Sequence, residues 1–379
     1  MNFQLTEEHL AVQEAAREFA QSELLPEVIE RDTEARFPHE QIEKMGELGF
    51  MGMMVDPKYN GGGMDTISYC IAMEEISKID ASASVSMSVN NSLVCWGLEK
   101  YGSEAQKQKY LTRLASGEIL GAFCLSEPEA GSDATSQKTS AELKGDHYIL
   151  NGTKNWITNG STASVYLVIA QTDASKAHKG ISVFIVEKDW EGFVVGKKED
   201  KLGIRGSDTH SLMFTDVIVP VENRIGEEGF GFTFAMETLN GGRIGIAAQA
   251  LGIASGAYEM SLAYSKERKT FGKPISEHQA IQFKLADMAT QIETARLLVH
   301  KAAWLKDQGE DYTLASAMAK VYASEVAMNV SVEAVQVHGG YGYVKEYHVE
   351  RLMRDAKITQ IYEGTSEIQR IVISRKILK

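Results

Sequence analysis

Apolar residues in the first third of the chain recur at the three- and four-residue spacing of amphipathic helices. This period predicts helices over 39–48, 67–79 and 103–116. An earlier helix is predicted to begin after Thr6, a favourable N-cap, and to end before Pro26. The first segment is therefore predicted to be helical.

The pattern changes near residue 120 to short apolar runs that are separated by clusters of turn residues. The runs read as β-strands and fall at 120–125, 147–151, 165–170, 181–186 and 211–217. Turns such as Lys144-Gly145-Asp146 separate them. We therefore expect a small β-domain inserted between helical segments.

The last 150 residues return to the helical period, with longer repeats. The predicted helices cover 231–266, 279–307 and 314–337, and their lengths fit a four-helix bundle. The first of them carries Gly245, Gly252 and Gly256, and each glycine costs roughly 1 kcal/mol against alanine in a helix. We expect another backbone or a ligand to approach the helix closely there.

The predicted fold is thus mainly α with an inserted β-domain. Its predicted divisions are an N-terminal helical domain over 1–120, a β-barrel-like middle domain over 121–225 and a C-terminal helical bundle over 226–379.

Composition narrows the function classes. The 379 residues carry 39 Lys+Arg against 52 Asp+Glu, and the resulting net charge of -13 disfavours binding to nucleic acid or anionic lipid. Cys70, Cys95 and Cys124 are widely spaced and lack a metal-ligand pattern, as expected of reduced thiols and no metal site. No basic presequence and no run of about 18 apolar residues occurs. We expect a cytoplasmic protein without membrane insertion.

The stretch 354–370, RDAKITQIYEGTSEIQR, places a carboxylate beside a helix start. Glu363 lies between Tyr362 and Gly364, and Ser366 with Gln369 forms a predicted capping box. Glu363 has two interpretations: an acid that only complements the helix dipole, or a general base at a pocket. The local spacing does not decide between them.

The middle segment offers two candidate ligand features. The loop 126–133, SEPEAGSD, is either a surface turn or a cradle for an anion. Trp156 and Thr158 would share one face of a strand, as a planar ligand requires, or form an ordinary core pair. No P-loop, Rossmann fingerprint, zinc spacing or G-x-S-x-G motif occurs.

Six segments in order resemble the acyl-CoA dehydrogenase family: LSEPEAGSD, KNWITNG, LNGGRIGIAAQALG, RKTFGKPI, QVHGGYGY and IYEGTSEIQR. The resemblance spans nearly the whole chain and is greatest to the short-chain, butyryl-CoA type. It implies FAD-dependent conversion of butyryl-CoA to crotonyl-CoA in fatty-acid or butyrate metabolism, with electrons passed to electron-transfer flavoprotein.

The resemblance implies that Glu363 is the catalytic base. It would remove the α-proton of the thioester while flavin takes the β-hydrogen as hydride. Because that α-proton is weakly acidic, the thioester carbonyl needs hydrogen bonds, one of them from the Glu363 N–H, and the base needs a raised pKa.

The family pattern also implies the ligand-binding residues. FAD would contact Phe123, Leu125, Ser126, Ser132, Trp156, Ile157, Thr158, Arg268, Phe271, Gln279, Gln336, Val337, His338, Gly339, Gly340, Thr365, Ser366 and Glu367. The acyl-CoA would contact Ser132, Asn240, Gly241, Gly242, Arg243, Gln249, Thr359 and Gly364.

Three of these positions bear on the branch of the family. Gln249 and Thr359 match residues that make the acyl pocket shallow in short-chain members. Gly242 stands where isovaleryl-type and long-chain relatives keep their base, which argues against those branches.

Sharing of FAD between subunits implies a homotetramer, a dimer of dimers. The alternatives are a dehydrogenase for 2-methylbutyryl or isobutyryl groups, an oxidase of the same fold, and a non-catalytic flavin-binding relative associated with nucleic acid.

Overall fold

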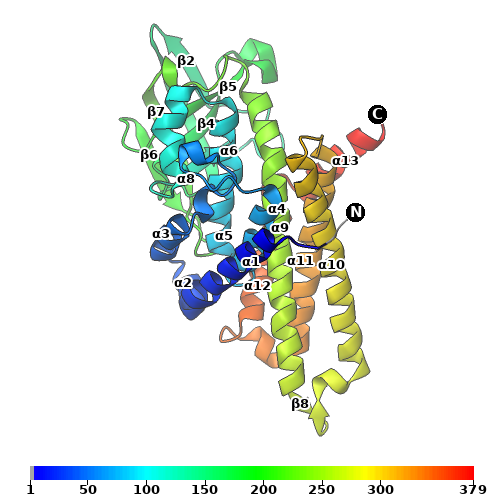
Figure 1. The fold of residues 1–379 in the computed structure, drawn as a ribbon. Coiled ribbons are helices and arrows are strands. Elements are labelled where there is room, and N and C mark those ends of the chain that lie inside the picture. Colours follow the sequence, from blue (N-terminus) through cyan, green and yellow to red (C-terminus); the bar gives the residue numbers. More distant parts are fainter. Residues whose placement is uncertain (1–3) are drawn as a thin grey trace.

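The computed structural model describes residues 4–379. Short helices and a sheet lie at one end, and the long helix α9 runs from beside the sheet to the opposite end (Figure 1). The hairpin β8–β9 marks that far end. The mainly α fold with an inserted β-domain is confirmed.

The N-terminal helices are α1 (Glu7–Phe19), α2 (Val28–Glu34), α3 (His39–Glu47), α4 (Thr66–Ser77), α5 (Ala81–Ser88), α6 (Trp96–Tyr101), α7 (Glu104–Gln106) and α8 (Thr112–Ala115). Thr6 caps α1, because its hydroxyl accepts from the His9 N–H at 3.2 Å. The predicted stop before Pro26 is wrong. A π-helical turn over Ala20–Leu24 and a 3-10 turn over Leu25–Glu27 continue the helix through Pro26, which stands in the first turn of a 3-10 helix, where its missing N–H costs no bond.

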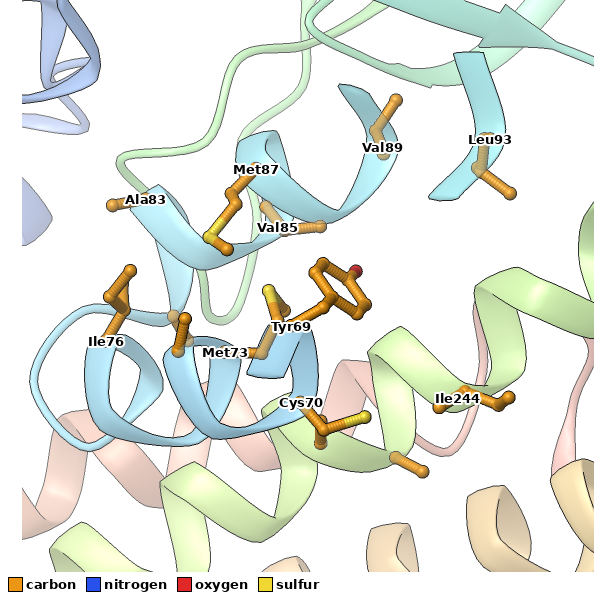
Figure 2. Close-up of a cluster of buried hydrophobic side chains, with 14 of the residues drawn as sticks. Tyr69, Cys70, Met73, Ile76, Ala83, Val85, Met87, Val89, Leu93 and Ile244 are labelled. Atoms are coloured by element: carbon orange, nitrogen blue, oxygen red, sulfur yellow. The ribbon is translucent and has the colours of Figure 1, made fainter. Parts of the chain in front are cut away.

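One continuous helical stretch, residues 81–101, was not predicted, because its sequence lacks the spacing of an amphipathic helix. It comprises α5, a π-helical segment over Val89–Cys95 and α6. Apolar and small polar side chains alternate in it without a solvent-facing side, because nearly all of it is buried. Figure 2 shows Val85 of this stretch pointing toward Tyr69 of α4. Met87 and Leu93 belong to the same buried cluster, together with Ile244 of α9.

The middle segment of the described chain forms a seven-stranded mixed sheet with the order β1-β4-β2-β3-β7-β6, and β5 pairs with β4. Its strands are β1 (Gly121–Cys124), β2 (Ser140–Lys144), β3 (His147–Thr158), β4 (Val165–Gln171), β5 (Ile181–Glu187), β6 (Phe193–Lys198) and β7 (Thr209–Pro220). The five predicted strands are confirmed. β2 escaped prediction because it is largely exposed and carries few apolar residues, and β6 because its apolar residues form a run of only three, Phe193 to Val195, before Gly196.

The C-terminal elements are α9 (Gly231–Glu267), β8 (Lys269–Thr270), β9 (Lys273–Pro274), α10 (Gln279–Asp307), α11 (Thr313–His338), α12 (His348–Ile358) and α13 (Ser366–Ile377). In Figure 1, α9, α10 and α11 run side by side. The expected close approach to the α9 glycines is confirmed: a Cβ on Gly252 would lie 2.4 Å from Glu74 O and one on Gly256 2.4 Å from Lys78 O. The backbone of α4 and its C-terminus therefore lies directly on α9.

The helix α12 joins distant parts of the chain. Arg351 donates to Ile79 O at 2.7 Å, and Arg354 donates to Asp32 on α2 at 2.7 Å. Asp355 accepts from the backbone N–H of Ile204, which follows the strand β6, at 2.5 Å. The N-terminal helices and the segment between β6 and β7 thus meet at the helix that leads to Glu363.

Candidate functional site

The turn between α12 and α13 holds Glu363 in an unusual backbone conformation. Glu363 has φ 52° and Gly364 φ 95°. Positive φ is costly for a residue with a side chain, whereas glycine adopts it freely. The predicted cap at Ser366 is wrong: the N-cap of α13 is Thr365, whose hydroxyl accepts from the Ile368 N–H at 3.3 Å.

The Glu363 carboxylate points at α9. A Cβ built on Gly242 would lie 2.1 Å from Glu363 Oε2 and 2.8 Å from Leu93 Cδ2, so the absence of a side chain at residue 242 makes room for the carboxylate. Oε2 is buried and has no hydrogen-bond partner among residues 4–379. The Glu363 N–H likewise has no acceptor in the described chain. Unpaired buried polar groups are rare in folded proteins and point to a ligand.

Burial raises the pKa of the Glu363 carboxyl to about 7, and the positive charges of Lys320 and Arg243 oppose the rise. At neutral pH the group is therefore close to half ionised. A carboxyl tuned in this way can take up a proton from a weak acid, whereas a helix dipole alone would stabilise the ionised form and lower the pKa. This favours the second interpretation of Glu363.

Arg243 and Asn240 lie on the same helix as Gly242. Arg243 is buried, and its guanidinium donates to the Asn240 side-chain oxygen. The Arg243 Nε has no partner among the described residues. At Gly241, one position before Gly242, an added Cβ would meet only Ser92 O, at 3.8 Å. This first half of α9 therefore brings together four predicted substrate residues, of which Gly242 contacts the carboxylate.

Gln249, two turns further along α9, closes the buried end of this region. Its amide Nε2 donates to Ala81 O at 2.9 Å and to Ser84 Oγ at 3.0 Å, and its Oε1 accepts from the Tyr362 hydroxyl. Thr359 is fully buried, and its hydroxyl donates to Ala356 O. Both predicted pocket residues are thus buried, and Gln249 bonds Tyr362, the neighbour of Glu363.

In the β-domain, Trp156 interrupts β3. Its φ is 62°, the register of β3 against β7 shifts between Lys154 and Ile157, and the side chain is 61% exposed. Trp156 and Thr158 therefore do not share a face by simple alternation, and Trp156 is not a core residue. Ile157 is buried in the β-domain core. A large exposed ring on an irregular strand is available for stacking.

The loop after β1 is fixed by a buried ion pair that the sequence patterns did not predict. Lys154 Nζ donates to Glu127 Oε1 at 2.7 Å and to Leu125 O at 3.0 Å. Glu127 also accepts from the Lys138 and Thr139 N–H groups. Phe123, Leu125 and Ser126 are half-buried at the start of this loop, and Ser132 is exposed at its far end.

A hollow of about 550 Å³ lies near the far end of α9. It brings together five of the predicted cofactor residues with Tyr264, namely Arg268, Val337, His338, Gly339 and Gly340. The rings of His338 and Tyr264 stack with centroids 4.3 Å apart, and the Arg268 guanidinium lies 5.2 Å from the Tyr341 ring centre.

Three other predicted cofactor residues lie outside that hollow. Gln279 and Gln336 are exposed. Phe271 is 97% exposed at the tip of the β8–β9 turn. Within this chain these side chains face solvent.

Thr365, Ser366 and Glu367 line a smaller hollow of about 220 Å³ together with Lys357 and Arg370. Two acids, Glu325 and Glu367, line it as well, and Arg370 donates to Glu325, so its charged side chains balance and only the first turn of α13 favours an anionic group. It shares no lining residue with the 550 Å³ hollow.

Lys320 was missed by the sequence patterns. It is fully buried on α11 and donates to Gly364 O at 2.7 Å. A lysine directly after the small and mostly apolar run 315–319, ASAMA, is a signal that could have identified it, because lysine is almost never fully buried without a function or a partner.

Residues 4–379 contain no group of three His, Cys, Asp or Glu side chains arranged to hold a metal ion. In the same part of the chain, no helix is long and apolar enough to span a membrane.

Comparison with known proteins identifies the family. Profiles for the N-terminal, middle and C-terminal domains of acyl-CoA dehydrogenase match residues 6–118, 122–217 and 229–378. The short-chain specific acyl-CoA dehydrogenase of Clostridium acetobutylicum is 53% identical over 379 residues, covering 100% of both chains. This chain belongs to the acyl-CoA dehydrogenase family.

Solved acyl-CoA dehydrogenase structures share the fold throughout. The butyryl-CoA dehydrogenase of Megasphaera elsdenii superimposes with a TM-score of 0.99 at 50% identity and 100% coverage of both chains. A chain from a study of the electron transferring flavoprotein of Acidaminococcus fermentans and flavin-based electron bifurcation gives 0.99 at 53% identity, again with full coverage. A complex of PigA with FAD and proline gives 0.96 at 29% identity, covering 100% of this chain and 99% of that one.

Proposed function

We propose that this acyl-CoA dehydrogenase oxidises a short, saturated acyl-CoA such as butyryl-CoA to the trans-2-enoyl-CoA, with Glu363 as the base. The observation that carries the proposal is the unpaired, buried Glu363 Oε2 beside an unpaired Glu363 N–H. One residue thereby offers a proton acceptor and a hydrogen-bond donor to one ligand. The names of the relatives from Clostridium and Megasphaera support the short-chain substrate.

The chain's own groups supply the proton chemistry. Glu363 Oε2 takes the α-proton, and the Glu363 N–H donates to the thioester oxygen as negative charge develops there. Because Gly242 has no side chain, the Glu363 carboxylate fits beside its Cα. Gln249 and Thr359 limit the depth of the pocket that is available to the acyl chain. Arg243 keeps a positive charge near the ionised base.

The residues present fit FAD. Trp156 offers an exposed ring for stacking against a flat heterocycle, and the first turn of α13 offers backbone N–H groups to an anionic group. We propose that all eighteen cofactor residues predicted from the sequence hold FAD. Six of them reach the FAD of a neighbouring subunit in a homotetramer, namely Arg268, Phe271, Gln279, Gln336, Gly339 and Gly340. FAD, when bound, accepts the β-hydrogen as hydride. We further propose electron-transfer flavoprotein as the electron acceptor and the cytoplasm as the location.

The identifying experiment is an anaerobic visible spectrum of the purified protein before and after addition of butyryl-CoA. We expect a yellow protein whose flavin bands bleach and give way to a broad long-wavelength band. If the bands respond to isobutyryl-CoA or 2-methylbutyryl-CoA but not to butyryl-CoA, the substrate is a branched acyl group. Peroxide formation during turnover would instead indicate an oxidase, and a shifted DNA band at low salt the nucleic-acid-associated alternative.

The pH dependence of kcat/KM for butyryl-CoA tests the base. Because the pKa of Glu363 is raised to about 7 and only the ionised form accepts a proton, kcat/KM should rise as the pH increases through about 7 and level off above it. The assay runs from pH 5.5 to 8.5 at constant ionic strength. A rate that is already constant from pH 5.5 upward would contradict a base with a raised pKa.

Gln249→Ala tests the depth of the acyl pocket. Removing the amide opens space beside Tyr362, so the ratio of kcat/KM for hexanoyl-CoA to that for butyryl-CoA should rise on the order of tenfold. Stability should fall by about 1–3 kcal/mol, because Ala81 O and the Tyr362 hydroxyl lose their partner. The control is Gln108→Ala, an exposed site remote in sequence. If the ratio is unchanged in Gln249→Ala, Gln249 does not limit the depth of the acyl pocket.

A further inference from the structure

The turn that carries Glu363 needs external support. Two consecutive residues, Glu363 and Gly364, have positive φ values of 52° and 95°. For a residue with a side chain this conformation costs on the order of 1–3 kcal/mol and persists only when neighbouring groups hold it. The carboxylate position therefore depends on whatever fixes the backbone of residues 363 and 364.

Two side chains provide that support through the same carbonyl. Gly364 O accepts from Lys320 Nζ at 2.7 Å and from Gln369 Nε2 at 2.9 Å. Gln369 Nε2 also lies 3.4 Å from Glu363 O. Lys320 comes from α11 and Gln369 from α13, so the turn is held from both sides.

Lys320 differs from Gln369 in carrying a charge into the site below its pKa, which burial lowers to about 8 while the charge of Glu363 opposes that fall. Its side chain is fully buried, and Gly364 O is the only acceptor that its ammonium has among the described residues. An ammonium has three donors, and burying it with one partner is costly. Because this costly buried charge lies next to an unpaired carboxylate, we infer that the charge acts on that carboxylate.

The remaining ionisable groups around the turn come from every helix packed against it. They are Arg243 on α9, Tyr69 on α4, Asp355 on α12, Glu367 on α13 and the adjacent Tyr362. The tyrosines stay neutral, since burial raises the pKa of Tyr69 and Tyr362. Among the described cations, Lys320 lowers the pKa of Glu363 more than Arg243 does.

We propose that Lys320 is a positioning residue for Glu363: it fixes the turn through Gly364 O and stabilises the ionised form of the base by its charge. The proposal rests on the proposed role of Glu363. It assigns a function to a residue of α11 that touches neither substrate nor reacting atoms.

The test compares Lys320→Met, which removes both hydrogen bond and charge, with Gln369→Met, which removes only hydrogen bonds. The purified, flavin-containing proteins are titrated in two ways. One is the pH profile of kcat/KM for butyryl-CoA. The other is the infrared carboxyl band of Glu363, obtained as the difference between each variant and the same variant with Glu363→Gln.

In Lys320→Met, the midpoint of both titrations should move upward by about one pH unit, because an opposite charge at close range lowers a carboxyl pKa by about that much or more. Below the midpoint, kcat/KM should fall about tenfold. Lys320→Arg, which keeps the charge, should leave both midpoints near the parent value. Gln369→Met should lower kcat and leave the midpoints unchanged.

The proposal is overturned if Lys320→Met titrates with the parent midpoint, or if Lys320→Arg shifts the midpoint as far as Lys320→Met does. Should Lys320→Met not fold, Lys320→Gln replaces it with the same expected shift. The infrared titration also separates this proposal from the proposed function. It reports the ionisation of Glu363 even if no acyl-CoA is turned over.

Discussion

Replacing Glu363 with glutamine should lower kcat for butyryl-CoA by about 10²–10⁴-fold, the usual contribution of a positioned base. Glutamine has nearly the shape of glutamate, so the turn at residues 363–364 and its bond from Lys320 should persist. Only the ability to accept the α-proton is lost. The measurement is single-turnover bleaching of the flavin by butyryl-CoA under anaerobic conditions.

The matched control is Glu47→Gln, an exposed acid on α3. It removes the same charge from the surface and should leave turnover at the parent level. Flavin content and melting temperature of Glu363→Gln should stay close to those of the parent protein. Normal turnover by Glu363→Gln would show that Glu363 is not the catalytic base, and the assignment of the fold would be unaffected.

Adding a single methyl group at Gly242 should have the second largest effect. The Cβ of Gly242→Ala would lie 2.1 Å from Glu363 Oε2, much closer than atoms approach without a bond. The carboxylate must move by about an ångström, and a displacement of that size can cost roughly 10²-fold in rate. Steady-state kcat with butyryl-CoA is the measurement.

Folding is controlled separately with Gly241→Ala. A Cβ there would meet only Ser92 O, at 3.8 Å, which is ordinary contact. Since alanine favours a helix over glycine by roughly 1 kcal/mol, this variant should not be less stable than the parent. If Gly242→Ala keeps full activity, the Glu363 carboxylate tolerates displacement and the geometric argument for its position fails.

The elements that the sequence identified correctly are those with one face buried. Helix α10 shows this, since Leu285, Met288, Ile292, Ala295 and Val299 are buried as their spacing predicts. The stretch over residues 81–101 has no exposed face, so its residues carry no period to detect. Strand β2 was not predicted for the opposite reason, because it is almost entirely exposed.

The sequence drew attention to residues of the candidate site, but it did not reveal what surrounds them in the fold. Glu363 and Gly364 stand out through their place before a helix, and family resemblance named most other positions. The pKa of Glu363 depends instead on burial against α9 and on Lys320, which lies 43 residues earlier. Such tertiary contacts leave no local pattern. The divisions at residues 120 and 225 and the individual ligand contacts stay predictions.

The junction at α12 has a consequence for how activity is gained during folding. Arg354 pairs with Asp32, and Asp355 with the N–H of Ile204, so this helix is held by segments that are 322 and 151 residues away along the chain. Contacts of such long range form late, since the intervening chain must be ordered first. Helical circular dichroism should therefore recover sooner on refolding than butyryl-CoA oxidation does, and the base should be the last part of the enzyme to reach its working position.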